Sequence, residues 1–100
     1  MFLAMNRFKI AKGFELGFEK VWKERDSYLK EVEGFISFNL LRCTEATDYV
    51  LYASHSVWES EHAFEAWTQS DHFRKAHAQA SAPKGTYLAH PDLELFTAVL

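Results

Sequence analysis

The order in which two hydrophobic periodicities follow one another is the strongest constraint on how this chain can fold. In residues 2–10 every second side chain would share one face of a strand, and most of these are apolar: Phe2, Ala4, Phe8 and Ile10. Asn6 falls on the same face. After Gly13 the apolar residues recur every three or four positions, which predicts one amphipathic helix that ends near Gly34.

The middle of the chain returns to strand-like composition. Residues 35–42 and 49–58 are rich in β-branched and aromatic residues, and a polar segment, CTEATD, separates them. This arrangement is typical of two antiparallel strands joined by a loop.

A second helical region follows and shows two candidate starts. Ser60 is a suitable N-cap, with Glu61 in the first turn, where a negative charge favours the helix dipole. Ser70, followed by Asp71, is another, so we expect the helical region to break there. Lys84 and Gly85 then mark a loop, and residues 93–100 predict a last strand.

The resulting order is βαββαβ, without internal repeats. It predicts an α+β, ferredoxin-like fold, with a four-stranded antiparallel sheet and two helical regions on one face. A chain of 100 residues can bury only one apolar core, so residues 1–100 are expected to form a single domain. This fold hosts many activities, and function must therefore be argued from the site.

The strand at residues 49–58 carries apolar side chains on both faces. Leu51 and Val57 point to one face, while Val50, Tyr52 and Trp58 point to the other. A strand that is apolar on both sides is usually covered on both sides. We therefore expect a homodimer in which two sheets pack face to face as a dimeric α/β barrel. In a monomer, Tyr52 and Trp58 are expected to remain as exposed surface.

Charge and cysteine content exclude several function classes. The net charge is −3, and the lysines and arginines are scattered, so no basic surface for nucleic acid is expected. Cys43 is the only cysteine, which rules out a disulfide within the chain and favours a cytoplasmic location. No apolar run approaches the length of a membrane span, and the N-terminal residues do not resemble a signal peptide.

Asn6 and His77 are the polar residues that the sequence singles out. Burying the Asn6 amide without partners would cost roughly 1–3 kcal/mol, so it either bonds a backbone group or water, or is aimed at a ligand oxygen. His77 shares a helical stripe with Phe73, Ala76 and Ala80, and these alanines could leave space for a large flat ligand. A neutral imidazole can ligate haem iron, although an isolated helical histidine is more often solvated or structurally bonded.

The other candidates have ordinary explanations. Trp67 and Phe64 lie one helical turn apart and would be core residues in most proteins. The remaining histidines have no zinc-like spacing, and we assign them no role: His55, His62, His72 and His90. The 16% aromatic content could also serve a ligand site or a subunit interface.

Several segments together resemble the antibiotic-biosynthesis-monooxygenase (ABM) superfamily: MNRF, VEGFISFNLLR, YVLYASHSVWES, FEAWTQSDHFRKAH and LELF. Within it they are most similar to the haem-degrading monooxygenases of the Isd type and their proteobacterial relatives. Part of the match is a motif shared widely in the superfamily, W-x-S-x-x-A-F-x-x-W, here Trp58, Ser60, Ala63, Phe64 and Trp67. Asn6, Trp67 and His77 match the more specific trio of the haem-degrading branch.

The resemblance implies a role for each matched residue. His77 would be the axial ligand of the haem iron, with Phe64 also contacting the haem. Asn6 would hydrogen-bond the iron-bound oxygen species, and Trp67 would crowd the porphyrin. Haem would be both cofactor and substrate, opened by O2 and by electrons from a reductase or a small-molecule reductant, to release iron and a bilin-type tetrapyrrole.

Two other functions remain open at this point. One is a cofactor-independent monooxygenase of the same superfamily that oxidises a polycyclic phenol, with Asn6 and Trp67 against the organic substrate and His77 ligating nothing. The other is a non-catalytic haem-binding dimer, which needs His77 but no turnover.

Overall fold

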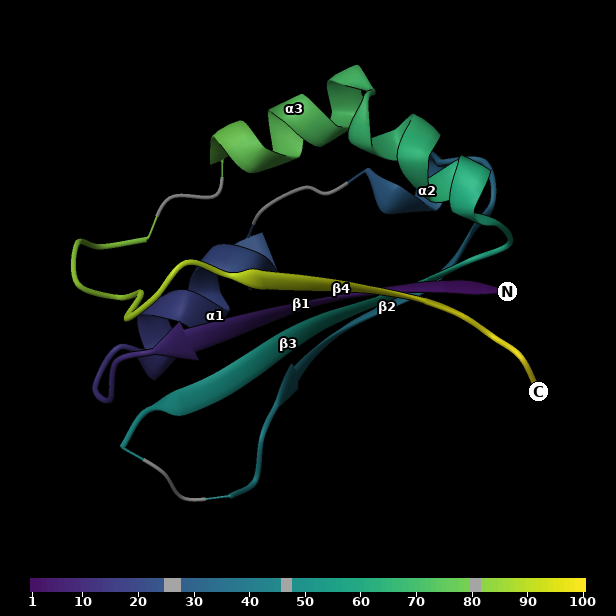
Figure 1. Ribbon diagram of the computed structural model, residues 1–100. Coiled ribbons are helices and arrows are strands. Elements are labelled where there is room, and N and C mark those ends of the chain that lie inside the picture. Colours follow the sequence, from purple (N-terminus) through teal and green to yellow (C-terminus); the bar gives the residue numbers. More distant parts are fainter. Residues whose placement is uncertain (25–27, 46–47, 80–81) are drawn as a thin grey trace.

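Four strands form one antiparallel sheet in the computed structural model, which describes residues 1–24, 28–45, 48–79 and 82–100, with only the backbone of residues 78 and 79. The strands are β1 (Phe2–Ile10), β2 (Phe35–Arg42), β3 (Val50–Trp58) and β4 (Asp92–Thr97). Their order across the sheet is β2-β3-β1-β4, and each neighbouring pair is antiparallel (Figure 1). This confirms the predicted α+β, ferredoxin-like fold.

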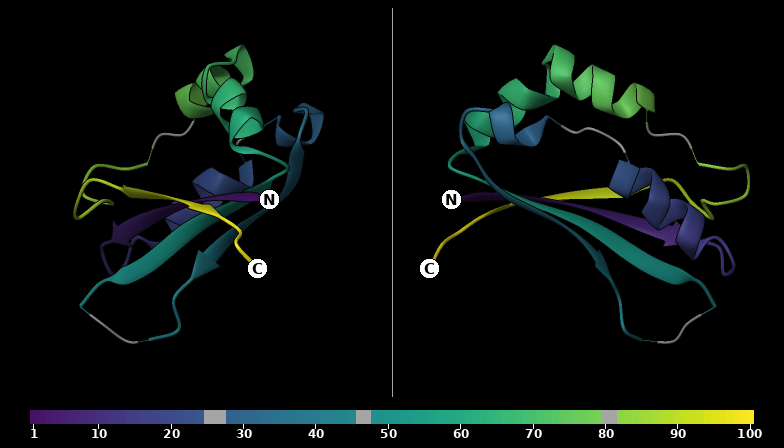
Figure 2. Two further views of the ribbon diagram at one scale, coloured as in Figure 1. Left: turned by 45° about the vertical axis from the view of Figure 1, so that its right-hand side comes forward. Right: turned by 180° about the vertical axis from the view of Figure 1, so that it is seen from behind.

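The helices pack against one face of this sheet. They are α1 (Glu15–Glu24), α2 (Glu61–Thr68) and α3 (Asp71–Gln79), with a short 3-10 turn at Leu29–Glu31. α2 and α3 arch over the sheet, and the views in Figure 2 show its other face without helices. None of the helices described has the length and apolar character needed to cross a membrane.

Both predicted helix starts in the second half are confirmed. The Ser60 hydroxyl accepts a hydrogen bond from the backbone N–H of Ala63 at 3.2 Å, as an N-cap does. The Ser70 hydroxyl accepts from the N–H of Phe73, also at 3.2 Å. The helical region therefore breaks at Ser70, and α3 starts in a new direction.

Three predicted boundaries were wrong in extent. The first helix does not continue to Gly34: α1 ends at Glu24, and Tyr28 has a left-handed backbone, with φ of 57°, which an α-helix cannot continue. β3 begins at Val50 rather than at residue 49. β4 ends at Thr97, the partner of Phe2, so Leu100 lies beyond the ladder.

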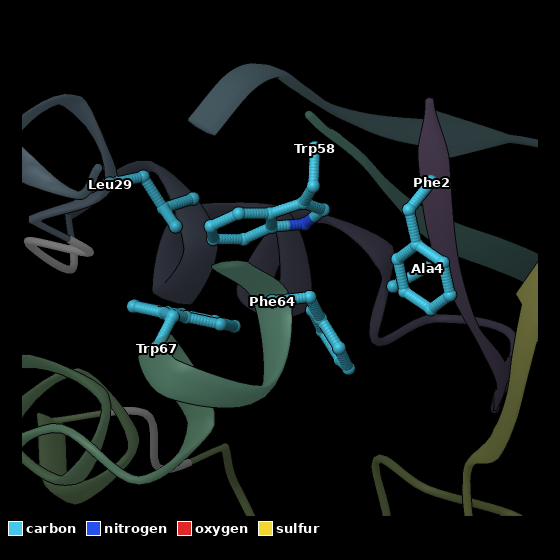
Figure 3. Close-up of a cluster of buried hydrophobic side chains, with 6 residues drawn as sticks. All are labelled: Phe2, Ala4, Leu29, Trp58, Phe64 and Trp67. Carbon is cyan, nitrogen blue, oxygen red and sulfur yellow. The ribbon is translucent and has the colours of Figure 1, made fainter. Parts of the chain in front are cut away.

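The core consists of two aromatic clusters on the helix-covered face. The first, which we call the α2 cluster, is drawn in Figure 3 and contains Phe2, Ala4, Leu29, Trp58, Phe64 and Trp67. The second, the α1 cluster, contains Phe8, Ile10, Phe18 and Tyr52. The α2 cluster includes residues at the beginning of β1, and the α1 cluster includes residues at its end. Asn6 lies between them.

The opposite face of the sheet is only partly covered and combines apolar residues with charged ones, among them Arg7 and Glu94, which form an ion pair at 3.6 Å. Tyr52 and Trp58 do not contribute to it, because helices of the same chain bury them to 1% and 0% exposure; the expectation that a monomer leaves them exposed was wrong. The open face instead presents Leu51, together with Leu41 and Phe96, which are 44% and 48% exposed.

Candidate functional site

A cavity of about 150 Å³ lies between the sheet and the helices α2 and α3. Its floor is formed by two cross-strand pairs of small or polar residues, Asn6 opposite Ser54 and Ala4 opposite Ser56. Aromatic residues flank this floor on both sides, in the α2 and α1 clusters. The space exists because side chains in the centre of the face are too short to fill the gap between the two clusters.

Asn6 presents an unpaired polar atom to this region. Its Oδ1 is buried and has no hydrogen-bond partner within the described residues. Such an atom costs roughly 1–3 kcal/mol unless something satisfies it. Since rotating the amide by half a turn exchanges the oxygen with the NH2 group, the same side chain can offer a ligand either an acceptor or a donor. A hydrogen bond between Oδ1 of Asn6 and a backbone group, one of the two expected possibilities, is not observed within the described residues.

Trp67 is both a core residue and a cavity residue. It is 8% exposed and packs on Trp58, with ring centroids 5.4 Å apart, which confirms its place in the core. Its Nε1–H is buried and has no partner among the residues described, whereas Nε1 of Trp58 donates to the Ser56 hydroxyl at 3.0 Å. Of these two tryptophans, only Trp67 lines the cavity, and only Trp67 leaves its indole donor unused within the described residues.

His77 reaches the cavity from α3. Its Nδ1 lies 2.9 Å from the backbone oxygen of Phe73, and its ring packs on the Phe73 ring with centroids 3.9 Å apart. A carbonyl oxygen can only accept, so this hydrogen bond requires the proton on Nδ1. The neutral imidazole then carries its free lone pair on Nε2, the form that binds metals.

The break at Ser70 brings Trp67 and His77 together. In one continuous helix, residues ten apart are separated by about 15 Å along the axis and by about 80° around it. Their ring centroids here are only 6.4 Å apart. The N-cap at Ser70 therefore makes it possible for both side chains to line one cavity.

The space near His77 does not come from the neighbouring alanines, as the sequence had suggested. Ala76 is fully buried and does not line the cavity, and Ala80 lies outside the described residues. The short residues that make the space are on the strands. Ser54 and Ser56 were missed, although they alternate with Tyr52 and Trp58 on the same face and the strand pattern could have identified them.

Trp22 and Phe38 were also missed as cavity residues. They come from α1 and β2 and line the side of the cavity, with their rings stacked at a centroid distance of 5.7 Å and an angle of 18°. Phe64 lines the cavity as well. The three residues matched by resemblance, Asn6, Trp67 and His77, thus meet around one cavity, although they come from three different elements.

Two examples of known proteins that are similar to this chain in sequence are a bacterial heme oxygenase and a heme degrader of known structure. A heme oxygenase (staphylobilin-producing) of Staphylococcus saprophyticus is 30% identical over 86 residues, which cover 84% of this chain and 80% of that protein. The heme degrader MhuD of Mycobacterium tuberculosis, solved with two hemes bound in its active site, superposes with a TM-score of 0.77 at 26% identity and covers 100% of this chain and 97% of its own.

Another solved structure shows how widely the fold is used. The cofactor-independent oxygenase SnoaB of Streptomyces nogalater superposes with a TM-score of 0.73 over 99% of this chain and 93% of its own, at 23% identity, which indicates a shared fold only. Residues 1–79 match the family described as antibiotic biosynthesis monooxygenase. On this match and on the Staphylococcus relative, the chain belongs to the antibiotic biosynthesis monooxygenase family.

Proposed function

We propose that this protein is a haem-degrading monooxygenase that binds haem in the cavity between the sheet and α3. One observation carries the proposal: His77, with its tautomer fixed by the Phe73 carbonyl, and Asn6, with an unpaired buried amide atom, line the same cavity from two layers of the fold. A candidate metal ligand and a hydrogen-bonding group in one cavity would suit haem, whose iron His77 would hold.

Each residue has a limited task in this proposal. His77 would hold the iron through Nε2, and its hydrogen bond to Phe73 keeps the ring oriented. Asn6 would offer a neutral hydrogen bond to the bound ligand, while Trp67 and Phe64 would form apolar walls that exclude water. The bound haem supplies the iron that activates O2, with electrons from an external reductant, and the expected products are iron and a bilin-type tetrapyrrole.

The residues that line the cavity suit haem, but the cavity itself is smaller than a haem molecule needs. A cavity of about 150 Å³ is below the roughly 300–1,000 Å³ typical of drug-sized ligands. A tetrapyrrole therefore requires that the α2–α3 layer shifts outward, that the edge of the macrocycle extends beyond the cavity, or both. A shift of α3 would have to rearrange its ring contacts, which include Phe73 on Trp67 and His72 on Tyr28.

The small volume is also the observation that favours the second candidate. An apolar cavity of about 150 Å³ can hold a single aromatic ring, so a cofactor-independent oxidation of a phenol would need less widening. A polycyclic phenol would lie against Asn6 and Trp67, and His77 would not bind metal. A non-catalytic haem-binding dimer would bind haem through His77 without degrading it. Titration with haem, followed by addition of a reductant under oxygen, distinguishes the three.

We also propose that the protein is a homodimer formed by packing the open faces of two sheets. The apolar side chains on that face support the proposal, since Leu41 and Phe96 are about half exposed in one chain and lie on either side of β3 and β1. Burial of such a patch against a second copy would remove it from water.

The first prediction concerns His77. His77→Ala should fold normally, because the residue is exposed and its loss leaves no packed core empty, but its haem complex should lose the imidazole-ligated Soret spectrum and its turnover with ascorbate and O2. The matched control is His72→Ala, on the same helix but away from the cavity lining, which should keep both. A wild-type spectrum and rate in His77→Ala would show that another group holds the iron.

A second prediction separates a functional from a structural role for Asn6. Because its buried Oδ1 has no partner in the described residues, Asn6→Leu should leave the free energy of unfolding unchanged or raise it by about 1 kcal/mol, while haem turnover falls. Ser56→Ala is the contrasting variant: it removes the acceptor of the Trp58 indole and should cost roughly 1–3 kcal/mol. Urea unfolding measures both. A loss of more than 1 kcal/mol in Asn6→Leu would make Asn6 a structural residue.

A third prediction tests the dimer. Light scattering at micromolar concentration should give twice the mass of the chain, and Leu51→Glu should shift the mass to that of a monomer, because it places a charge beside Leu41 in the apolar part of the open face. The control is Leu16→Glu, at an 84% exposed position on α1, which should leave the mass unchanged. A wild-type monomer would refute the proposed assembly.

A further inference from the structure

A second hollow lies beside the cavity, on the same face of the sheet. We call it the α1–β2 pocket; it measures about 420 Å³ and is lined by Glu19, Trp22, Lys23, Phe38, Arg42 and Tyr52, among others. Trp22 and Phe38 line both hollows. Their stacked rings thus form a shared wall, which places the α1–β2 pocket directly beside the cavity.

Hydrogen bonds fix the polar groups on one side of this pocket. The Tyr52 hydroxyl donates to Glu19 at 2.5 Å, and Nη1 of Arg42 lies 3.3 Å from the same carboxylate oxygen. Burial, followed by the nearby Glu19 carboxylate, raises the pKa of Tyr52 to about 12, so the hydroxyl remains a neutral donor at physiological pH. Glu19 is therefore already occupied by two donors of its own chain.

The remaining charge in the pocket is positive. Lys23 forms no ion pair within the part of the chain that the structure describes, and Arg42 uses one of its five N–H donors on Glu19. Lys23 and Arg42 contribute a charge of +2 and Glu19 contributes −1, so the lining of the pocket has a net charge of +1. Such a pocket favours an anionic group, and a carboxylate suits both a lysine and the free edge of a guanidinium.

We infer that the α1–β2 pocket receives the carboxylates of the haem substrate, with Lys23 as their main partner. The inference rests on the proposed function, because haem carries two carboxylates at one edge of a macrocycle too large for the cavity. If that edge is held at Lys23, the macrocycle cannot turn freely about the bond between iron and His77. Lys23 would then determine which meso carbon lies beside Asn6, and so which tetrapyrrole isomer forms.

The test compares two ligands and two lysines. Lys23→Gln removes the unpaired cation, whereas Lys20→Gln, on the same helix, removes a lysine that pairs with Glu24 at 3.9 Å and does not line the pocket. Each variant and the wild type are titrated with haem and with haem dimethyl ester, in which both carboxylates are methylated. Both lysines are exposed, so neither change should disturb the fold.

Lys23→Gln should weaken the binding of haem by about two- to fivefold at low salt, the range for an exposed ion pair, and should change the ratio of tetrapyrrole isomers. Lys23→Glu should weaken it further. Binding of the dimethyl ester should be the same in wild type, Lys20→Gln and Lys23→Gln. Equal haem affinity and equal isomer ratios in Lys23→Gln and wild type would overturn this inference alone. Failure of the wild type to bind haem would overturn it together with the proposed function.

Discussion

The site depends on a gap in packing at the centre of the sheet. Aromatic side chains hold the helices to the sheet at both ends of β1, through the α2 cluster and the α1 cluster. Between them, Ala4, Asn6, Ser54 and Ser56 are too short to meet the helical layer. The two clusters supply stability, and the interval between them is free to bind a ligand. Filling the interval with larger apolar residues would be expected to stabilise the fold at the expense of the site.

The second requirement is the break between α2 and α3. The N-cap at Ser70 turns the chain so that Trp67 and His77 approach to 6.4 Å between ring centroids. The bond from His77 to the Phe73 carbonyl then selects one tautomer. Local hydrogen bonds, each worth about 1 kcal/mol, thus place the side chain on which the proposed chemistry depends.

Much of the fold could be predicted because its determinants are local. Alternation along β1 and the serines at both helix starts correctly located the strand and the break at Ser70. The end of α1 could not be predicted from the sequence. Amphipathic spacing continues past Glu24, and nothing in the periodicity indicates the left-handed backbone of Tyr28. Strand faces were assigned correctly, but which face the helices cover depends on tertiary packing, and so the fate of Tyr52 was misjudged.

The residues that line the candidate cavity were predicted in part, and for mixed reasons. Asn6 was conspicuous because a polar residue interrupted an apolar alternation, and His77 because small residues surround it, while Trp67 gained significance only from resemblance to a family. Trp22 and Phe38 gave no signal, because an aromatic residue at core spacing looks the same whether it fills a core or borders a cavity. The α1–β2 pocket combines residues from α1, β2 and β3, and only the folded chain brings them together.

The most direct measurement is a crystal structure of the protein with a haem analogue that cannot be oxidised. We expect the porphyrin to lie between the sheet and α3, with its metal at bonding distance from Nε2 of His77 and with Asn6 on the opposite side of the ring. A porphyrin bound elsewhere, or bound in the cavity with its metal away from His77, would contradict this expectation.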